Sequence, residues 1–146
     1  MALGAVTQAE AAVIIQPQSA STDLGVRDSF VIDNAINQSG LSVGYISGVT
    51  DFDAYLAGDP EHAAGESWIA ADPAPGSITF DLGSVFNLDG MAMWGPGTLL
   101  DVRNFELFAS STGDVDSFTS LGSFLQDPRP PIGSPNTAEV FDFDAT

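Results

Sequence analysis

The chain has 146 residues and a mass of 15.1 kDa, which is the size of one folded domain. It carries 20 Asp and Glu but only three Lys and Arg, which gives a formal net charge of −17 at pH 7. Proteins bind nucleic acids and anionic lipids by neutralising phosphates with Lys and Arg, so this charge excludes both kinds of partner. Cys is absent, which excludes a disulfide framework and any metal site built on thiolates.

The N-terminus, residues 1–11, has the composition of the end of a secretory signal. Small and apolar residues lead to Ala9-Glu10-Ala11, an A-x-A pattern of the kind that signal peptidase cuts. We therefore expect a secreted protein, with residues 1–11 as a signal remnant or N-terminal arm and residues 12–146 as the single domain. No apolar run approaches the ~20 residues that a membrane-spanning helix needs, so membrane insertion is not expected.

Short strands separated by turns are expected along the rest of the chain. Ile78, Phe80 and Leu82 alternate with polar residues, which is the two-residue period of a strand with one buried face. By this kind of pattern, strands are expected at residues 12–16, 29–36, 77–82, 85–94, 103–110, 117–125 and 138–143. Long loops are expected at residues 37–75, which are rich in Gly, Ser, Asp and Pro, and at 126–136, which contain four prolines. This spacing predicts an all-β fold, an antiparallel β-sandwich or jelly roll.

The residue types argue against catalysis. The only His is His62, Lys and Cys are absent, and the sequence has neither a G-x-S-x-G nucleophile turn nor an H-E-x-x-H metal helix. Asp51 and Asp53 form a pair of carboxylates. Two residues apart on an extended segment, however, they lie on one face without the spacing between acid and nucleophile that a glycosidase requires. We therefore expect a protein that is not an enzyme.

The middle of the chain carries motifs of a known family. They are Trp68-Ile69, the run GSITFDLG at residues 76–83, LDGMAMW at 88–94 and VRNFELFASS at 102–111. In this order they resemble discoidin-type domains, the C-type modules of coagulation factors, which have the galactose-binding-like fold. The resemblance covers residues 29–143. At residues 37–42 and 45–53 it extends to a version found in exported bacterial proteins related to those with a PEP-CTERM sorting tail.

The family pattern continues after the position of Phe141. It runs into an aromatic-Arg-hydrophobic strand and then a final strand, and neither is present in this sequence. Either the sequence is a fragment of a longer chain or a neighbouring chain completes the sandwich. An open strand edge invites pairing with another chain, and the apolar residues 12–15 are a candidate donor strand.

Calcium is the metal that the sequence predicts. Asp51 and Asp53 lie in a loop that contains Gly, and Asp59 and Glu61 follow, so hard oxygen ligands stand close together in the sequence. The resemblance implies the same ion, because discoidin-like domains often carry a structural Ca²⁺ in such loops. The spacing is not that of an EF-hand, and solvated surface carboxylates are the competing interpretation.

The resemblance also implies a glycan as ligand. Sugar sites combine an aromatic face with polar groups that bind the hydroxyls. Tyr45, Tyr55, His62 and Arg103 lie in or near the expected loops and are the predicted ligand-binding residues. The two Trp residues stand beside strand residues and are expected in the core instead.

Together these observations predict a secreted, non-catalytic β-sandwich module that acts outside the cell in adhesion, by binding a glycan or a component of the extracellular matrix. The alternative is a structural subunit of an extracellular fibre, which polymerises with copies of itself by strand donation. An accessory region of a glycoside hydrolase is a third hypothesis. A binding module elutes as a monomer and is retained on a glycan surface, whereas a fibre subunit forms filaments without any sugar.

Overall fold

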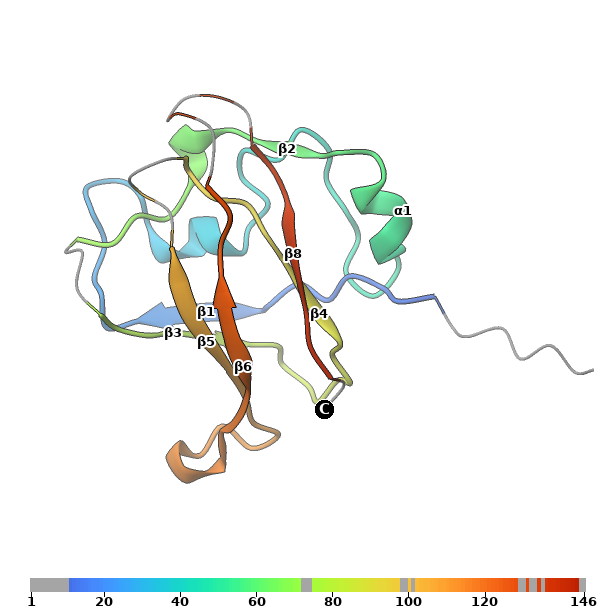
Figure 1. Cartoon of the computed structure of the whole chain (residues 1–146), viewed down its shortest axis with the longest axis vertical. Coiled ribbons are helices and arrows are strands. Elements are labelled where there is room, and N and C mark those ends of the chain that lie inside the picture. The colour runs from blue at the N-terminus through green and yellow to red at the C-terminus, as the bar shows by residue number, and fades with distance from the viewer. Residues whose placement is uncertain are drawn as a thin grey trace, which may run out of the picture.

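The computed structural model describes residues 11–71, 75–97, 100, 102–128, 131, 134 and 136–144. In chain order the elements are β1 (Ser19–Thr22), η1 (Ile32–Ala35), α1 (Phe52–Leu56), β2 (Glu61–His62), η2 (Ala64–Glu66), β3 (Ile78–Asp81), β4 (Gly90–Met93), β5 (Asn104–Ala109), η3 (Val115–Ser117), β6 (Thr119–Leu125), β7 (Asn136–Thr137) and β8 (Glu139–Asp142) (Figure 1). The three η elements are short 3₁₀ helices. Strands predominate, so the all-β class expected from the sequence is confirmed.

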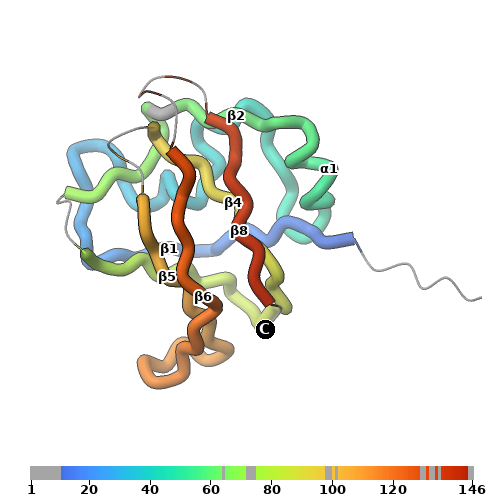
Figure 2. The backbone as a smooth tube through the Cα atoms, in the orientation of Figure 1, coloured from blue at the N-terminus to red at the C-terminus, as the bar shows by residue number. Residues whose placement is uncertain are grey.

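The strands form four two-stranded antiparallel ladders. They pair β1 with β3, β2 with β7, β4 with β8, and β5 with β6. In Figure 1, the β5–β6 ladder crosses in front of the β1–β3 ladder, and β4 and β8 lie to the right of them. The tube in Figure 2 follows the long connection from β1 to β3, in light blue and green, which holds η1, α1 and η2. No helix in the described ranges is long and apolar enough to cross a membrane.

The expected strand at residues 12–16 is wrong, because only one isolated bridge, between Val13 and Asp51, forms there. Two backbone hydrogen bonds flank that bridge: the Ile14 N–H donates to the Thr50 carbonyl at 3.0 Å, and the Phe52 N–H donates to the Ala12 carbonyl at 2.9 Å. Pro17 has no N–H to donate and interrupts this pairing. The first true strand, β1, begins only after Pro17 and pairs with β3.

The expected strand at residues 29–36 is also wrong, since the 3₁₀ helix η1 takes its place. The Asn34 N–H donates to the Val31 carbonyl at 3.1 Å, and the Ile36 N–H donates to the Asp33 carbonyl at 3.0 Å. Asp and Asn are depleted in strands and favour local turns, which explains the helical turn at Asp33-Asn34.

Two other segments also differ from the expectation. The strand expected at residues 85–94 is limited to β4, Gly90–Met93. The loop expected at residues 37–75 contains α1, β2 and η2. Helix α1 begins after Asp51, whose carboxylate accepts a hydrogen bond from the Ala54 N–H at 2.7 Å and so caps the helix.

A cluster of three phenylalanines joins the β5–β6 ladder to β8. The ring centroids of Phe105 and Phe124 are 5.5 Å apart, and Phe141 meets these two rings edge-on at 4.9 and 5.7 Å. Phe141 is only 6% exposed. Edge-to-face and offset contacts at such distances add to the stabilisation from burial, so this cluster fixes the hairpin against its neighbour.

A second aromatic cluster lies between α1 and β4. Tyr55 meets Tyr45 at 5.6 Å and Trp94 at 6.5 Å between ring centroids. The Tyr55 hydroxyl donates to the Val43 carbonyl at 2.5 Å, and the Trp94 indole N–H donates to the Pro60 carbonyl at 2.9 Å. Trp94 is half-buried in this cluster, and Trp68 is half-buried as well, so the two Trp residues expected in the core are only partly buried.

Candidate binding site

The β5–β6 hairpin presents one face of its side chains to solvent. This outer face consists of three cross-strand pairs, Asn104 with Leu125, Glu106 with Ser123, and Phe108 with Ser120. All six residues are exposed, whereas the β5 residues between them are half-buried. Phe108 is 51% exposed and Leu125 is 67% exposed. The outer face therefore combines apolar surface with amide, carboxylate and hydroxyl groups.

A bulge in β6 determines which residue stands opposite Phe108. The register shifts between Leu107 and Phe108, so that Leu107 pairs with Gly122 while Phe108 pairs with Ser120. Leu121 is the extra residue of the bulged strand. Gly122 has φ of 134°, a value that residues with side chains rarely adopt. The bulge thus places a hydroxyl, rather than the side chain of Leu121, opposite Phe108.

The loop between β5 and β6 is organised by its own hydroxyl groups. The Ser110 hydroxyl accepts hydrogen bonds from the Thr112 N–H at 3.1 Å and the Gly113 N–H at 2.8 Å. The Ser117 hydroxyl lies against that of Ser110 and donates to the Asp114 carbonyl at 2.6 Å. These bonds satisfy backbone groups that would otherwise bond to water, so they stabilise the end of the hairpin.

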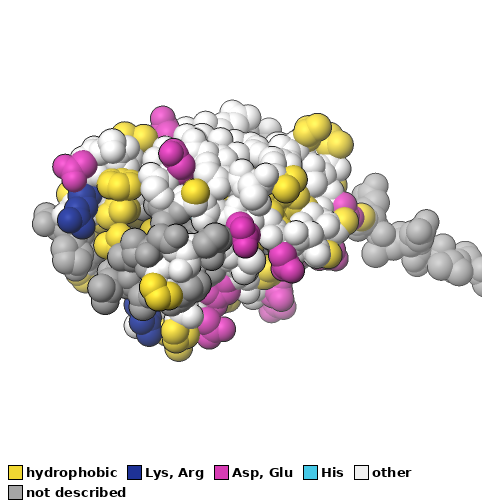
Figure 3. Space-filling view, turned by 90° about the horizontal axis from the view of Figure 1, so that it is seen from above, with side chains coloured by type: hydrophobic (Ala, Val, Ile, Leu, Met, Phe, Trp, Pro, Cys, Tyr) yellow, Lys and Arg dark blue, Asp and Glu magenta, His cyan; other side chains and the backbone are white. Residues whose placement is uncertain are grey.

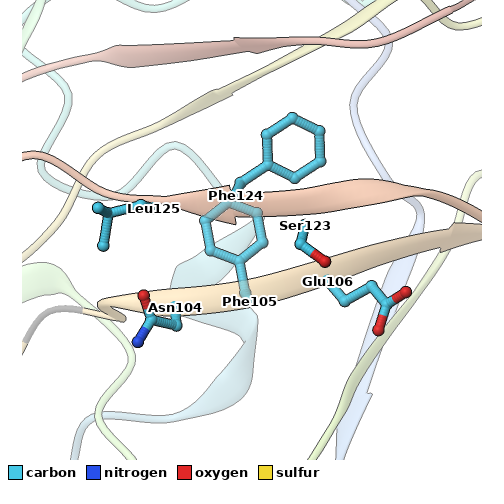
Figure 4. Close-up of a pocket in the computed structure, with 6 residues that line it drawn as sticks. All are labelled: Asn104, Phe105, Glu106, Ser123, Phe124 and Leu125. Atoms are coloured by element: carbon cyan, nitrogen blue, oxygen red, sulfur yellow. The ribbon is translucent and has the colours of Figure 1, made fainter.

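A shallow depression of about 470 Å³ lies in the hairpin. It is lined by Asn104, Phe105, Glu106, Ser123, Phe124 and Leu125, which Figure 4 shows projecting from the two strands. Next to it, the Ser120 hydroxyl donates to a carboxylate oxygen of Glu106 at 2.8 Å and so orients that carboxylate. Each of these polar groups can exchange a hydrogen bond with a ligand hydroxyl.

The four predicted ligand-binding residues do not converge at this site. Tyr55 is 9% exposed and His62 is 7% exposed, so both belong to the interior. Tyr45 is half-buried against Tyr55, and Arg103 is exposed at the start of β5. Only Arg103 adjoins the depression in sequence, since it precedes Asn104.

Burial also shifts the pKa values of the three residues in the interior. It raises the pKa of Tyr45 and Tyr55 above the ordinary value, and the neighbouring Tyr55 raises the pKa of Tyr45 further. Burial lowers the pKa of His62, while the Ser39 backbone and the Glu66 carboxylate act in the opposite direction. The His62 Nδ1 atom is buried without a hydrogen-bond partner, as are Ser67 Oγ and Asn136 Oδ1. His62 is thus a neutral interior residue at pH 7.

The four predicted calcium ligands are spread over different elements. Asp51 is occupied as the cap of α1, Asp53 lies in the first turn of that helix, and Asp59 and Glu61 are exposed around the start of β2. In the part of the chain that the structure describes, no three His, Asp or Glu side chains are grouped so as to hold a metal ion. Calcium binding stays a prediction from the sequence.

Comparisons with known proteins identify no relative: no family model, no curated protein and no solved structure matches the chain. The resemblance to discoidin-type domains therefore stays a prediction. The candidate site rests on its own geometry.

The outer face was not among the sites predicted from the sequence, although one signal was present. Asn104, Glu106 and Phe108 share one side of the alternating strand β5, so Phe108 is an aromatic residue on the polar side. An aromatic side chain among hydrogen-bonding groups is the combination that sugar-binding surfaces use.

Proposed function

We propose that this protein is a non-catalytic module that binds glycans through the outer face of the β5–β6 hairpin and acts outside the cell in adhesion or matrix binding. One observation carries the proposal: the exposed ring of Phe108 shares its face with the Glu106 carboxylate and the hydroxyls of Ser120 and Ser123. A sugar ring has an apolar C–H side and a rim of hydroxyls. An aromatic ring beside hydrogen-bonding groups is complementary to both.

The finer architecture and the location are parts of the same proposal. We take the four ladders to be parts of the two layers of a discoidin-like β-sandwich, with β5 and β6 in front of β1 and β3 (Figure 1). Export is supported by the A-x-A pattern of Ala9-Glu10-Ala11, of which Ala9 and Glu10 lie outside the described residues. The net charge of −17 favours solubility of an exported protein.

The proposal keeps the expectation that the protein is not an enzyme, and the lining of the depression supports it. Hydrolysis of a glycosidic bond ordinarily needs two carboxyl groups at a defined separation. Glu106 is the single carboxylate among the residues that line the depression. One carboxylate beside hydroxyl and amide groups suits recognition of a sugar.

The alternative function, self-assembly by strand donation, has less support than glycan binding. The reason is that the expected donor strand already has partners in its own chain. Residues 12–14 are hydrogen-bonded to residues 48–52 of their own chain, through the bonds of Ile14 and Phe52 and through the Gly48 N–H, which donates to the Ile14 carbonyl at 2.8 Å. To donate this segment, a subunit would first have to break these bonds.

The test is retention on polysaccharides with a matched pair of variants. Phe108→Ala removes the ring from the outer face, and Phe80→Ala removes a Phe that is 40% exposed on the separate ladder β1–β3. Loss of a ring contact of about 1 kcal/mol corresponds to roughly fivefold weaker binding for Phe108→Ala. Phe80→Ala should bind as the unmodified protein does. Binding is measured on cellulose, chitin and xylan, and by calorimetric titration with their soluble oligosaccharides.

Two results contradict the proposal. One is that none of these polysaccharides or oligosaccharides binds the unmodified protein. The other is that Phe108→Ala and Phe80→Ala change binding equally, because the loss would then not come from the outer face.

A further inference from the structure

A second surface lies between strands β6 and β8. A shallow groove of about 450 Å³ is lined by Leu121, Gly122, Ser123, Phe124, Asp142, Phe143 and Asp144. One wall comes from β6 and the other from the end of β8 and the two residues after it. The edge-on contact of Phe124 with Phe141, at 5.7 Å between ring centroids, ties the two strands together through their side chains.

The backbones of β6 and β8 do not pair with each other. Among the described strands, β6 forms a ladder with β5 and β8 forms one with β4, and no ladder joins β6 to β8. Each of the two strands is therefore an edge strand on the side that faces the groove. An edge strand presents backbone N–H and C=O groups that an extended segment of another chain can pair with.

The walls of the groove are partly apolar. Gly122 contributes no side chain to the β6 wall, and the Phe124 ring lies 3.4 Å from the position that a Cβ atom of Gly122 would take. Leu121, Phe124 and Phe143 supply apolar surface along the walls. A strand whose alternate residues are apolar would bury them against these three side chains.

Charge determines what kind of strand fits. Asp142 and Asp144 are exposed in the groove wall, and neither Lys nor Arg is among the residues that line it. Figure 3 shows acidic side chains spread over the face seen from above, with the basic side chains confined to one end of it. A second copy of this chain, with its net charge of −17, would be repelled.

We propose that the groove between β6 and β8 binds an extended segment of a different protein, one that alternates apolar residues with Lys or Arg and pairs its backbone with an edge strand of the groove. Its apolar side chains contact Leu121, Phe124 and Phe143, and its cations face Asp142 and Asp144. The segment acts as an added strand beside the outer face, with which the groove shares Ser123.

The probe is a seven-residue peptide of alternating Lys and Val, labelled for fluorescence anisotropy. A peptide of alternating Glu and Val has the same backbone and the opposite charge. A Lys-Val peptide with N-methyl groups on alternate residues keeps the charge but cannot donate hydrogen bonds along one edge. We expect the first peptide to bind and the other two to bind at least tenfold more weakly, because strand addition needs both the cations and the backbone donors.

The groove is tested with a matched pair of double variants. Asp142→Asn with Asp144→Asn removes two charges from the groove, and Asp53→Asn with Glu61→Gln removes two from exposed positions elsewhere. Exposed charge pairs are individually weak, so the first double variant should bind the Lys-Val peptide roughly three- to tenfold more weakly. The second should bind it as the unmodified protein does.

Hydrogen exchange distinguishes strand addition from adsorption to an acidic surface. Bound Lys-Val peptide should slow the exchange of backbone amides in β6 or β8 and leave those of β1 and β3 unchanged. The proposal is overturned if the peptide does not bind, if the N-methylated peptide binds equally well, if both double variants lose the same affinity, or if no amide of β6 or β8 gains protection.

Discussion

The substitution Phe141→Ala tests whether the phenylalanine cluster holds the hairpin against β8. Phe141 is 6% exposed and touches Phe105 at 4.9 Å and Phe124 at 5.7 Å between ring centroids. Truncating a buried Phe to Ala costs roughly 3–5 kcal/mol, through lost burial and the cavity left behind. Each lost ring contact adds about 0.5–1.5 kcal/mol to the simple cost of burial, which places the expected loss in the upper part of that range.

Urea unfolding followed by circular dichroism measures this loss. With a slope of roughly 1–3 kcal/mol per molar urea, a loss of about 4.5 kcal/mol lowers the midpoint by about 1.5 M or more. The matched control is Val140→Ala on the same strand, where the side chain is 40% exposed and the expected loss is under about 1 kcal/mol. Equal midpoints for Phe141→Ala and Val140→Ala would show that the cluster does not hold the fold together.

Three further substitutions test local features of the fold. Asp51→Ala removes the cap of α1 and should lower the free energy of unfolding by about 1 kcal/mol, whereas Asp51→Asn should retain it; equal losses would contradict capping. Gly40 has φ of 80°, and Gly40→Ala places a Cβ atom 2.8 Å from the Glu66 Cβ. Gly48 has a similar φ of 73° but open space around it, so Gly40→Ala should destabilise the protein more than Gly48→Ala does. Thermal unfolding of the two variants measures the difference. Burial lowers the pKa of His62, so the unfolded chain binds more protons and stability should fall as pH drops below about 6.5. His62→Gln should flatten the dependence of the melting temperature on pH in that window, and an unchanged slope would assign it to other groups.

Strands could be predicted where apolar and polar residues alternate clearly in the sequence. The prediction failed where pairing with another strand, or a local turn, determines the structure. The segments 77–82 and 103–110 became β3 and β5 because apolar residues recur at every second position. β1, with the sequence SAST, has no apolar pattern and exists because β3 pairs with it. Residues 29–36 have the alternation of a strand, but the local turn at Asp33-Asn34 forms the 3₁₀ helix η1 instead.

The functional surfaces were harder to predict for a related reason. The aromatic residue Phe108 on the polar side of β5 was visible in the sequence, but the bulge that places Ser120 opposite it was not. Tyr55 and His62 were expected at a ligand because they fall in a segment predicted to be a loop, yet they lie in α1 and β2 and are buried. The groove between β6 and β8 joins residues 121–124 with 142–144, a juxtaposition that no periodicity encodes.

Salt should weaken binding at one of the two proposed surfaces and leave binding at the other nearly unchanged. The outer face offers hydroxyls, an amide and a ring around one carboxylate, Glu106, so binding of a neutral oligosaccharide involves little net charge. The groove places Asp142 and Asp144 against the cations of a bound strand. Because the Debye length falls from about 30 Å at 0.01 M salt to about 8 Å at 0.15 M, added salt should weaken peptide binding and leave oligosaccharide binding nearly constant. Titrations of both ligands over this range separate the sites: a common salt dependence would mean that one electrostatic surface, rather than two distinct ones, accounts for both.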